Sequence, residues 1–230
     1  MVFDSLHLTV LHYGLWFREA EHQLGLEKAI AADERVWDKV LETTLKRLAS
    51  AAGTQLHNGI PAALNNLSEE ELAGLADEMA KNWVACDGIW FQDIEHNYDY
   101  EMFTTKRIND SNWVRFSNIE AHLIMQRYQL PANGGLPVLK EALQHRQYAR
   151  ICKFEFEEKA NKLIVRINEC RVQLARRKRG LAEYNCKSSG VAEYSYFALA
   201  IDPRIKMRCL SCPPEPHPKE FWCAWEFSIK

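Results

Sequence analysis

The residues of this sequence best suited to chemistry are cysteines near its C-terminus, where residues 150–230 hold six of the seven. Cys209 and Cys212 form a CxxC pair, a spacing that places two sulfurs on one side of a turn. Four thiolates suit Zn²⁺ or an iron–sulfur cluster, and three thiolates with one imidazole suit Zn²⁺. The spacing therefore predicts a metal site whose ligands come from Cys186, Cys209, Cys212 and Cys223, with His217 or Cys170 as substitutes.

Two other interpretations of the cysteines remain open. Small buried thiols can fill gaps in a core, and a single thiol can serve as a reactive nucleophile. Cys86 and Cys152 lie on apolar faces of an expected helix and strand, so we expect both in the core. The N-terminus has neither a basic region nor a small-residue cleavage site. Without a signal peptide, we expect a cytoplasmic protein with reduced thiols.

A second group of residues suits the binding of a small molecule. The chain has seven tryptophans, enough to line an aromatic pocket. We expect Trp90, Phe91 and Trp113 to line this pocket, with Glu95 and Arg171 as polar anchors. Glu95 lies one helical turn after the Trp-Phe pair, a position that equally suits a hydrogen-bonded scaffold carboxylate.

Each half of the helical region carries a carboxylate three residues before a histidine, as Glu19…His22 and Asp93…His96. Residues three apart on a helix share a face, and di-metal bundles combine such pairs with carboxylates from two more helices. Solvated charge pairs on surface helices give the same pattern, and the neighbouring charges favour that interpretation.

Residues 171–179 form a basic run with four arginines and one lysine. Basic runs occur in nucleic-acid-binding proteins, but the chain has a net charge of −2 and no aromatic stripe accompanies the run. We expect instead a charged helix face that pairs with the glutamates of residues 155–169. A further alternative is that Arg171 or Arg176 clamps a carboxylate ligand, because a guanidinium fork matches carboxylate geometry.

The elements that must position these residues come from a repeated sequence. Residues 14–27 and 88–101 are identical at six of fourteen positions when offset by 74 residues. The similarity continues at an offset of 76 residues, through Trp37/Trp113 and Pro61/Pro137. Apolar residues recur at three- and four-residue steps in both copies, which predicts helices. A helical hairpin that is used twice favours an antiparallel bundle.

The periodicity predicts helices in the repeated part over residues 6–24, 30–48, 68–96, 104–128 and 137–150. Ser68 and Glu71 form a capping box at the start of the third. Further along, apolar and polar residues alternate, which predicts strands over residues 151–156, 163–167, 205–210 and 221–229. Helices are expected between them over residues 171–179 and 188–200. The predicted fold is α+β, a duplicated helical-hairpin bundle (residues 1–67 and 68–150) followed by a cysteine-rich cap with a small antiparallel sheet (residues 151–230).

The composition limits the classes of partner. A net charge of −2 gives no general attraction to nucleic acid or to an anionic membrane. Hydrophobic residues make up 47% of the chain, enough for a core, yet no apolar run reaches the roughly 18–20 residues that span a bilayer. We therefore expect a small-molecule ligand and no nucleic-acid or membrane partner, and a homodimer remains open.

The C-terminal part carries a further set of runs: Glu169-Cys170-Arg171, Asp202-Pro203-Arg204, Cys212-Pro213-Pro214 and Cys223-Ala224-Trp225. With the GxWFxxxE pattern at residues 88–95, they resemble an uncharacterised family of prokaryotic cytosolic proteins. That family is related to the L-2-amino-thiazoline-4-carboxylic acid hydrolase-like proteins and, more distantly, to 4-vinyl-reductase-type ligand-binding domains. The resemblance implies a cap that binds a small molecule and cysteines that hold zinc. Residues 221–225 replace the Gly-Asp-x-Cys-Cys run of the hydrolase-like members.

Together these features predict a cytosolic, metal-containing protein that binds a small molecule. An alternative is a hydrolase of a small cyclic C–N or C–S compound, such as a thiazoline or an amidine. In that reaction metal-bound water or a thiolate would attack, and Glu95 or Glu169 would transfer protons. A second alternative is an iron–sulfur redox protein with four thiolate ligands.

Overall fold

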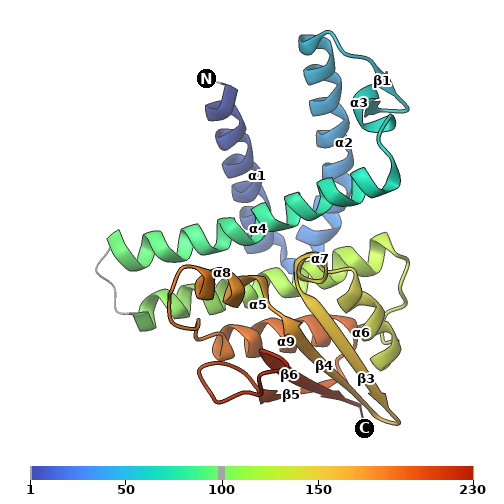
Figure 1. Cartoon of the computed structure of the whole chain (residues 1–230). Helices are drawn as coiled ribbons and strands as arrows, with labels where there is room; N and C mark the ends of the chain where they lie inside the picture. The colour runs from blue at the N-terminus through green and yellow to red at the C-terminus, as the bar shows by residue number, and fades with distance from the viewer. Residues whose placement is uncertain (1, 98–101, 230) are drawn as a thin grey trace. The chain divides into compact units, whose positions relative to one another are not determined.

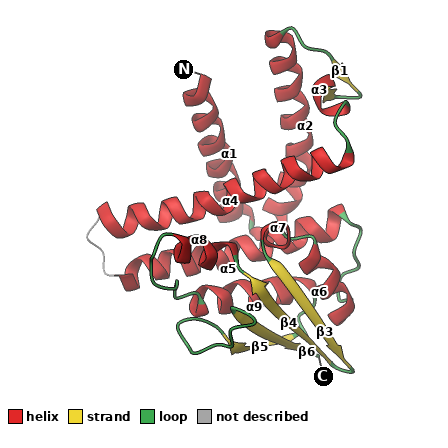
Figure 2. Ribbon diagram, viewed as in Figure 1, coloured by secondary structure: helices red, strands yellow, loops and turns green. Residues whose placement is uncertain are grey.

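The computed structural model describes residues 2–97 and 102–229, and it confirms the predicted α+β class. The chain forms two compact units, Met1–Leu72 and Ala73–Lys230. Figure 1 traces the order of the elements, and Figure 2 distinguishes helices from strands. No helix in these described ranges is long and apolar enough to cross a membrane.

The first unit is built on the predicted helical hairpin. α1 (Val2–Leu24) and α2 (Leu26–Ala52) are separated by Gly25 alone, whose φ of +87° glycine adopts without strain. Only three hydrophobic side chains are buried among the described residues of this unit: Ala29, Ile30 and Ala49. The hairpin therefore leaves much of its apolar surface exposed.

A short segment then leads to the second copy through β1 (Leu56–His57), β2 (Ile60–Pro61) and α3 (Ala62–Asn65). The second copy consists of α4 (Glu69–Asn97) and α5 (Met102–Arg127), as predicted. The capping box is confirmed. The Ser68 backbone N–H donates to the Glu71 carboxylate at 2.8 Å, and the Glu71 N–H donates to Ser68 Oγ at 3.2 Å.

The prediction of a single helix over residues 137–150 was wrong, because the chain forms two helices there. α6 (Gly135–Gln144) ends before α7 (Gln147–Ile151), and Arg146 between them is extended, with φ −67° and ψ 152°. The Arg146 side chain is fully buried, and its guanidinium binds two carboxylates. They are Glu120, at 2.7 Å, and Glu193, at 2.5 Å. These distant partners explain a break that helical periodicity does not predict.

The cap contains a four-stranded antiparallel sheet with the strand order β3-β4-β6-β5 (Figure 2). Its strands are β3 (Lys153–Lys159), β4 (Lys162–Glu169), β5 (Lys206–Ser211) and β6 (Cys223–Ser228). β4 and β6 occupy the centre and are the most buried, whereas β3 and β5 form the edges and carry many charged residues.

Two helices complete the second unit, α8 (Arg171–Lys178) and α9 (Lys187–Ile201). The core lies where α5, α6 and α9 pack against β4 and β6. Gly190 of α9 meets the Trp225 indole so closely that an added Cβ would lie 2.6 Å from the ring. This close approach fixes α9 on the sheet and brings the start of α9 over the cysteines of the cap.

Candidate functional site

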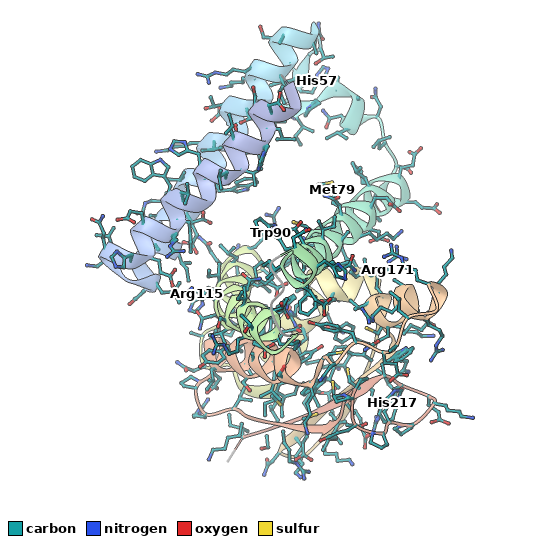
Figure 3. The ribbon with its side chains drawn as sticks, turned by 90° about the vertical axis from the view of Figure 1, so that its left-hand side faces the viewer. His57, Met79, Trp90, Arg115, Arg171 and His217 are labelled. Atoms are coloured by element: carbon teal, nitrogen blue, oxygen red, sulfur yellow. The ribbon has the colours of Figure 1, made fainter. Side chains whose placement is uncertain are left out.

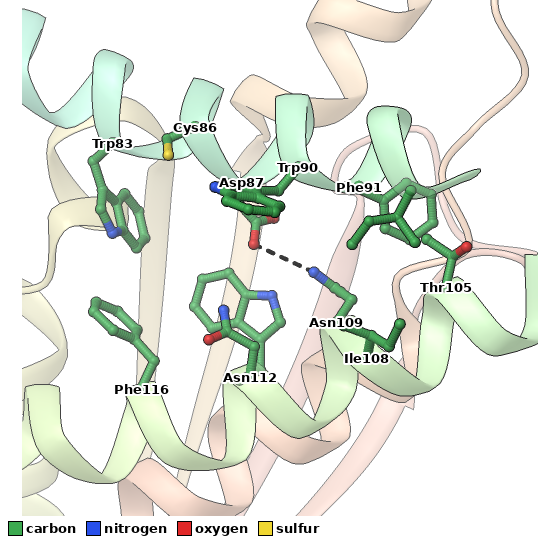
Figure 4. A pocket seen from close by; sticks show the side chains of 12 residues that line it. Trp83, Cys86, Asp87, Trp90, Phe91, Thr105, Ile108, Asn109, Asn112 and Phe116 are labelled. Carbon is green, nitrogen blue, oxygen red and sulfur yellow. Dashed lines mark hydrogen bonds between the residues drawn. The ribbon is translucent and has the colours of Figure 1, made fainter. Parts of the chain in front are cut away.

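The candidate site begins with a cavity of about 460 Å³ between α4 and α5, here called the aromatic cavity (Figure 4). Trp90, Phe91 and Trp113, the residues expected to bind a ligand, all line it. Trp113 is 4% exposed at the inner wall, whereas Trp90 is 65% exposed at the rim. The cavity therefore has a closed aromatic floor and an open edge.

The floor is a cluster of rings in mutual contact. The ring of Trp83 lies 5.9 Å from Trp113, 5.5 Å from Phe116 and 5.0 Å from Tyr148. Aromatic pairs at such separations stabilise each other by about 0.5–1.5 kcal/mol beyond their burial. The cluster holds α4 over α5 through side chains, and this contact gives the cavity a fixed shape.

Two polar features interrupt the apolar lining. The Asn109 amide donates to Asp87 Oδ1 at 3.3 Å, as the dashed line in Figure 4 marks. Burial raises the pKa of Asp87, although the Asn109 hydrogen bond and the Lys106 charge oppose that shift. Thr105 is 1% exposed, and its hydroxyl oxygen has no hydrogen-bond partner among the described residues.

A second cavity of about 90 Å³, the thiol cavity, lies behind the first and shares Asp87, Asn109 and Trp113 with it. Five cysteines line the thiol cavity: Cys152, Cys170, Cys186, Cys212 and Cys223. They lie just before β3, just after β4, just before α9, just after β5 and at the start of β6. The fold therefore gathers sulfurs from distant parts of the chain around one small space.

The thiols in this cavity interact with one another. The pKa of the Cys186 thiol is raised, mainly by its hydrogen bond with Cys212 and next by burial. The pKa of Cys152 is raised in the same way by Cys170 and by burial. Cys186 also accepts a hydrogen bond from Gln173 Nε2 at 2.9 Å. Burial and the neighbouring thiols favour the neutral forms of Cys152 and Cys186, and the Gln173 hydrogen bond opposes this effect at Cys186.

The structure brings together four of the six predicted metal ligands: Cys170, Cys186, Cys212 and Cys223. Cys209 pairs with Trp225 across β5 and β6 and does not line the thiol cavity. His217 lies on the loop before β6 (Figure 3). Its ring contacts Glu183 at 3.2 Å. Within the described residues, no group of three or more His, Cys, Asp or Glu side chains is placed to hold a metal ion.

The other predicted site residues lie apart from the two cavities. Glu95 is half-buried on α4, and Glu169 is exposed at the end of β4, where it pairs with Lys153 at 3.6 Å. Arg171 lines a third space, between α4 and α8. Cys86 was expected in the core, but this prediction was wrong because it is exposed on α4 at the wall of the aromatic cavity.

The first helical copy contains an equivalent of the aromatic cavity, with a volume of about 500 Å³, between α1 and α2. Trp16 and Phe17 line it, at the positions that Trp90 and Phe91 occupy in the second copy. Ala29 is the counterpart of Thr105, so the first copy lacks the buried hydroxyl. The repeat is thus visible in the cavities as well as in the sequence.

A comparison with models of protein families identifies the family of this chain. A family model described as "Family of unknown function (DUF6125)" matches residues 1–68 and residues 65–229. The chain belongs to this family. No curated protein matches the sequence. None of these matches concerns thiazoline hydrolases, so the predicted kinship to them stays a prediction.

One solved structure is similar to part of the chain. It is the phenol-responsive sensory domain of the transcription activator PoxR with phenol, at 12% sequence identity and a TM-score of 0.43. The match covers 63% of this chain and 73% of the other. A similarity of this size carries no conclusion about the function of this DUF6125 chain.

Sequence reasoning missed a polar cluster on the wall of the thiol cavity. Lys106 is 8% exposed, and its ammonium donates to Ser189 Oγ at 3.1 Å and to the Tyr184 hydroxyl at 3.2 Å. The Tyr184 hydroxyl donates in turn to Asn109 Oδ1 at 3.4 Å. A chain of hydrogen bonds therefore connects Lys106 to Asp87. No local signal marks it, because Tyr184 lies 78 residues from Lys106 in sequence.

A second missed group is the buried ion-pair network around Arg146. Its partner Glu193 lines the thiol cavity, and burial raises the pKa of Glu193 to about 6 against the opposing charge of Arg146. A carboxyl group with that pKa can exchange a proton near neutral pH. The thiol cavity is thus lined by thiols and by the carboxyl groups of Asp87 and Glu193, and the aromatic cavity by aromatic rings, Asp87 and the unpartnered hydroxyl of Thr105.

Proposed function

We propose that the aromatic cavity binds a small, flat and largely apolar molecule that carries one hydrogen-bond donor. The buried, unpartnered hydroxyl of Thr105 is the observation that carries this proposal. A buried polar atom without a partner costs about 1–3 kcal/mol. A ligand N–H or O–H that reaches this oxygen would remove that penalty.

The remaining lining supports the same class of ligand. A volume of about 460 Å³ is typical of pockets for small organic molecules. Trp83, Trp113 and Phe116 offer edge and face contacts to a flat ring. Asp87 provides an additional acceptor at the inner wall, so a molecule with a donor group fits better than one with acceptors only.

Indole and indene form a matched pair of probes, because they share a shape and differ in the N–H group. We expect indole to bind roughly three- to tenfold more tightly than indene, the equivalent of one hydrogen bond of about 1 kcal/mol. Tryptophan fluorescence and calorimetric titration would measure both affinities. Equal affinities in the wild type would contradict the proposal.

Thr105→Val tests the hydroxyl itself, since valine keeps the shape and removes the oxygen. We expect this variant to lose most of the preference for indole and to be no less stable than the wild type, because it removes an unsatisfied buried group. Asn112→Ala, on the same helix and the same cavity wall, is the control that should keep the preference for indole. A Thr105→Val variant that keeps the wild-type preference for indole would overturn the assignment of this residue.

A metal in the thiol cavity is a second candidate, supported by the five thiols that line it. Thiolates suit Zn²⁺ or an iron–sulfur cluster. The donors do not converge closely enough as they stand, so binding would require side-chain rotations that bring Cys186, Cys212 and Cys223 together. We expect metal analysis of anaerobically purified protein to detect bound metal that Cys212→Ser loses and Cys86→Ser keeps. Substoichiometric metal in the wild type would exclude this candidate.

The hydrolase alternative has less support. Glu95 and Glu169, the predicted proton-transfer residues, line neither the aromatic cavity nor the thiol cavity. Of the two carboxyl groups that line the thiol cavity, Glu193 is the one whose pKa burial raises to about 6. A hydrolytic reaction in this protein would therefore depend on Glu193, and Glu193→Gln would abolish it while Glu169→Gln would not.

A further inference from the structure

A third space, the basic cleft, lies between α4 and α8 and has a volume of about 300 Å³. The α4 residues that line it, such as Lys81, Val84 and Gln92, lie on a different face of the helix from Trp83 and Trp90. The basic cleft is therefore separate from the aromatic cavity, although Asp87 and Phe91 contribute to both.

The cleft is strongly positive within a chain of net charge −2. Arg171, Arg176 and Arg179 line it from the α8 segment, and Lys81, which pairs with Glu78 at 2.6 Å, lines it from α4. The spacing of the three arginines places them along one side of α8 and its C-terminal turn. Arg177 points elsewhere, since its guanidinium stacks on Trp222 at 4.4 Å. Asp87 is the only carboxylate in the lining.

The expected pairing of this basic run with the glutamates of residues 155–169 was wrong. Those glutamates pair with other cations: Glu155 and Glu157 with Arg166, Glu158 with Lys140, and Glu169 with Lys153. In the described parts of the chain, none of the five cationic side chains of residues 171–179 forms an ion pair with a carboxylate. Arg176 donates instead to the Ala182 carbonyl at 2.7 Å.

Apolar side chains flank these unpaired charges. Ile89 is 67% exposed and Leu181 is 47% exposed, and both line the cleft. Val84 and Phe91 continue the apolar wall inward along α4. A row of unpaired guanidinium groups beside exposed hydrocarbon matches a molecule with an anionic head and an apolar tail.

We propose that the basic cleft binds the carboxylate of a single-chain amphiphile, a free fatty-acid-like molecule. Arg171 and Arg179 would hold the carboxylate in forked hydrogen bonds, and the chain would cover Ile89, Val84 and Leu181. Nucleic acid fits the cleft less well, because its two aromatic residues, Phe91 and Tyr184, pack edge to face on each other at 5.2 Å and offer no stacking surface.

Octanoate and octan-1-ol, which differ in the charged head, test this proposal by calorimetric titration of the full chain. We expect octanoate to bind at least tenfold more tightly than the alcohol, with an affinity that falls as salt rises. The double variant Arg171→Ala/Arg179→Ala should lose this preference. Lys178→Ala, which removes a charge from the same helix outside the cleft, should keep it. Equal binding of octanoate and octanol, or an unchanged preference in the double variant, would overturn the proposal.

Three further measurements separate this cleft from other sources of binding. Inorganic phosphate should bind at least tenfold more weakly than octanoate, and equal binding would refute a site for an amphiphile. Vesicles of phosphatidylglycerol and phosphatidylcholine should not bind, and vesicle binding without octanoate binding would assign the patch to a membrane surface. The Thr105→Val variant should bind octanoate with the wild-type affinity. Loss of octanoate binding in this variant would place the fatty acid in the aromatic cavity instead.

Discussion

Asp33 and Asn109 occupy equivalent positions in the two helical hairpins, and each hydrogen-bonds the residue that faces it on the preceding helix. Tyr13 donates to Asp33 at 2.7 Å in the first copy, and Asn109 donates to Asp87 at 3.3 Å in the second. Tyr13 and Asp87 are themselves equivalent in the repeat. The cross-link between helices is thus preserved, while the donor has moved from the first helix to the second.

Tyr13→Phe removes the cross-link of the first hairpin and leaves the ring in place. We expect the free energy of opening of α1 and α2 to fall by about 0.5–1.5 kcal/mol, the usual contribution of one hydrogen bond. Hydrogen exchange of the amides in both helices measures this quantity. Tyr196→Phe is the control, because Tyr196 is 41% exposed. Equal effects of the two substitutions would show that the Asp33 bond does not stabilise the hairpin.

Gly190→Ala is expected to destabilise the second unit, since the new Cβ would lie 2.6 Å from the Trp225 ring. Overpacking of this kind costs about 1–3 kcal/mol, which exceeds the gain of about 1 kcal/mol from replacing glycine in a helix. Gly74→Ala, on α4 with open space around it, should be neutral or stabilising. Urea denaturation compares the two, and a Gly190→Ala variant as stable as wild type would refute the contact.

The carboxylate of Asp202 makes the stability of the cap depend on pH in the acidic range. The carboxylate is fully buried, accepts hydrogen bonds from Arg204 and from the Gly135 N–H, and the Arg204 side chain lowers its pKa to about 2. Because the folded pKa is below the ordinary value of 3.8, this stabilisation is present above pH 3.8 and is lost as the pH falls toward 2.

Asp202→Asn should therefore lower the free energy of unfolding at neutral pH by about 1–3 kcal/mol and flatten its fall below pH 3.8. Denaturation by urea at a series of pH values provides the measurement. Lys206→Ala, at the exposed start of β5, is a control that should leave the acid profile unchanged. An Asp202→Asn variant with the wild-type acid profile would contradict the role of this carboxylate.

We expect iodoacetamide to alkylate Cys86 before the other cysteines. Cys86 is exposed on α4, whereas the other six cysteines are half-buried or buried. Only the accessible thiolate reacts with iodoacetamide. Mass spectrometry after a short pulse should find one modified site in the wild type and none in Cys86→Ser. Rapid modification of Cys186 or Cys212 would show that the thiol cavity opens to solvent.

Local signals in the sequence predicted the helices well. The capping box at Ser68 and Glu71 and the helical periodicity of the two copies act over a few residues, and the structure confirms them. The break between α6 and α7 depends on carboxylates that lie 26 and 47 residues from Arg146. Such a contact leaves no trace in the local pattern.

The set of cysteines that line the thiol cavity likewise depends on contacts that the local sequence does not predict. The CxxC spacing favours Cys209 and Cys212 as a pair, but an irregularity in β5 between Cys209 and Ser211 shifts the register against β6. Cys209 then lies opposite Trp225, and Cys212 continues into the thiol cavity. Cys152 joins that cavity because β3 and β4 bring it near Cys170. Strand register, which one sequence does not specify, decided which thiols meet.

The edges of the four-stranded sheet have a consequence for the protein at high concentration. β3 presents Lys153, Glu155 and Lys159 along one edge, and β5 presents Lys206 and Arg208 along the other. A strand from a second molecule would have to bury these charges in order to pair with the free backbone groups. The sheet therefore resists growth by edge-to-edge strand pairing between molecules.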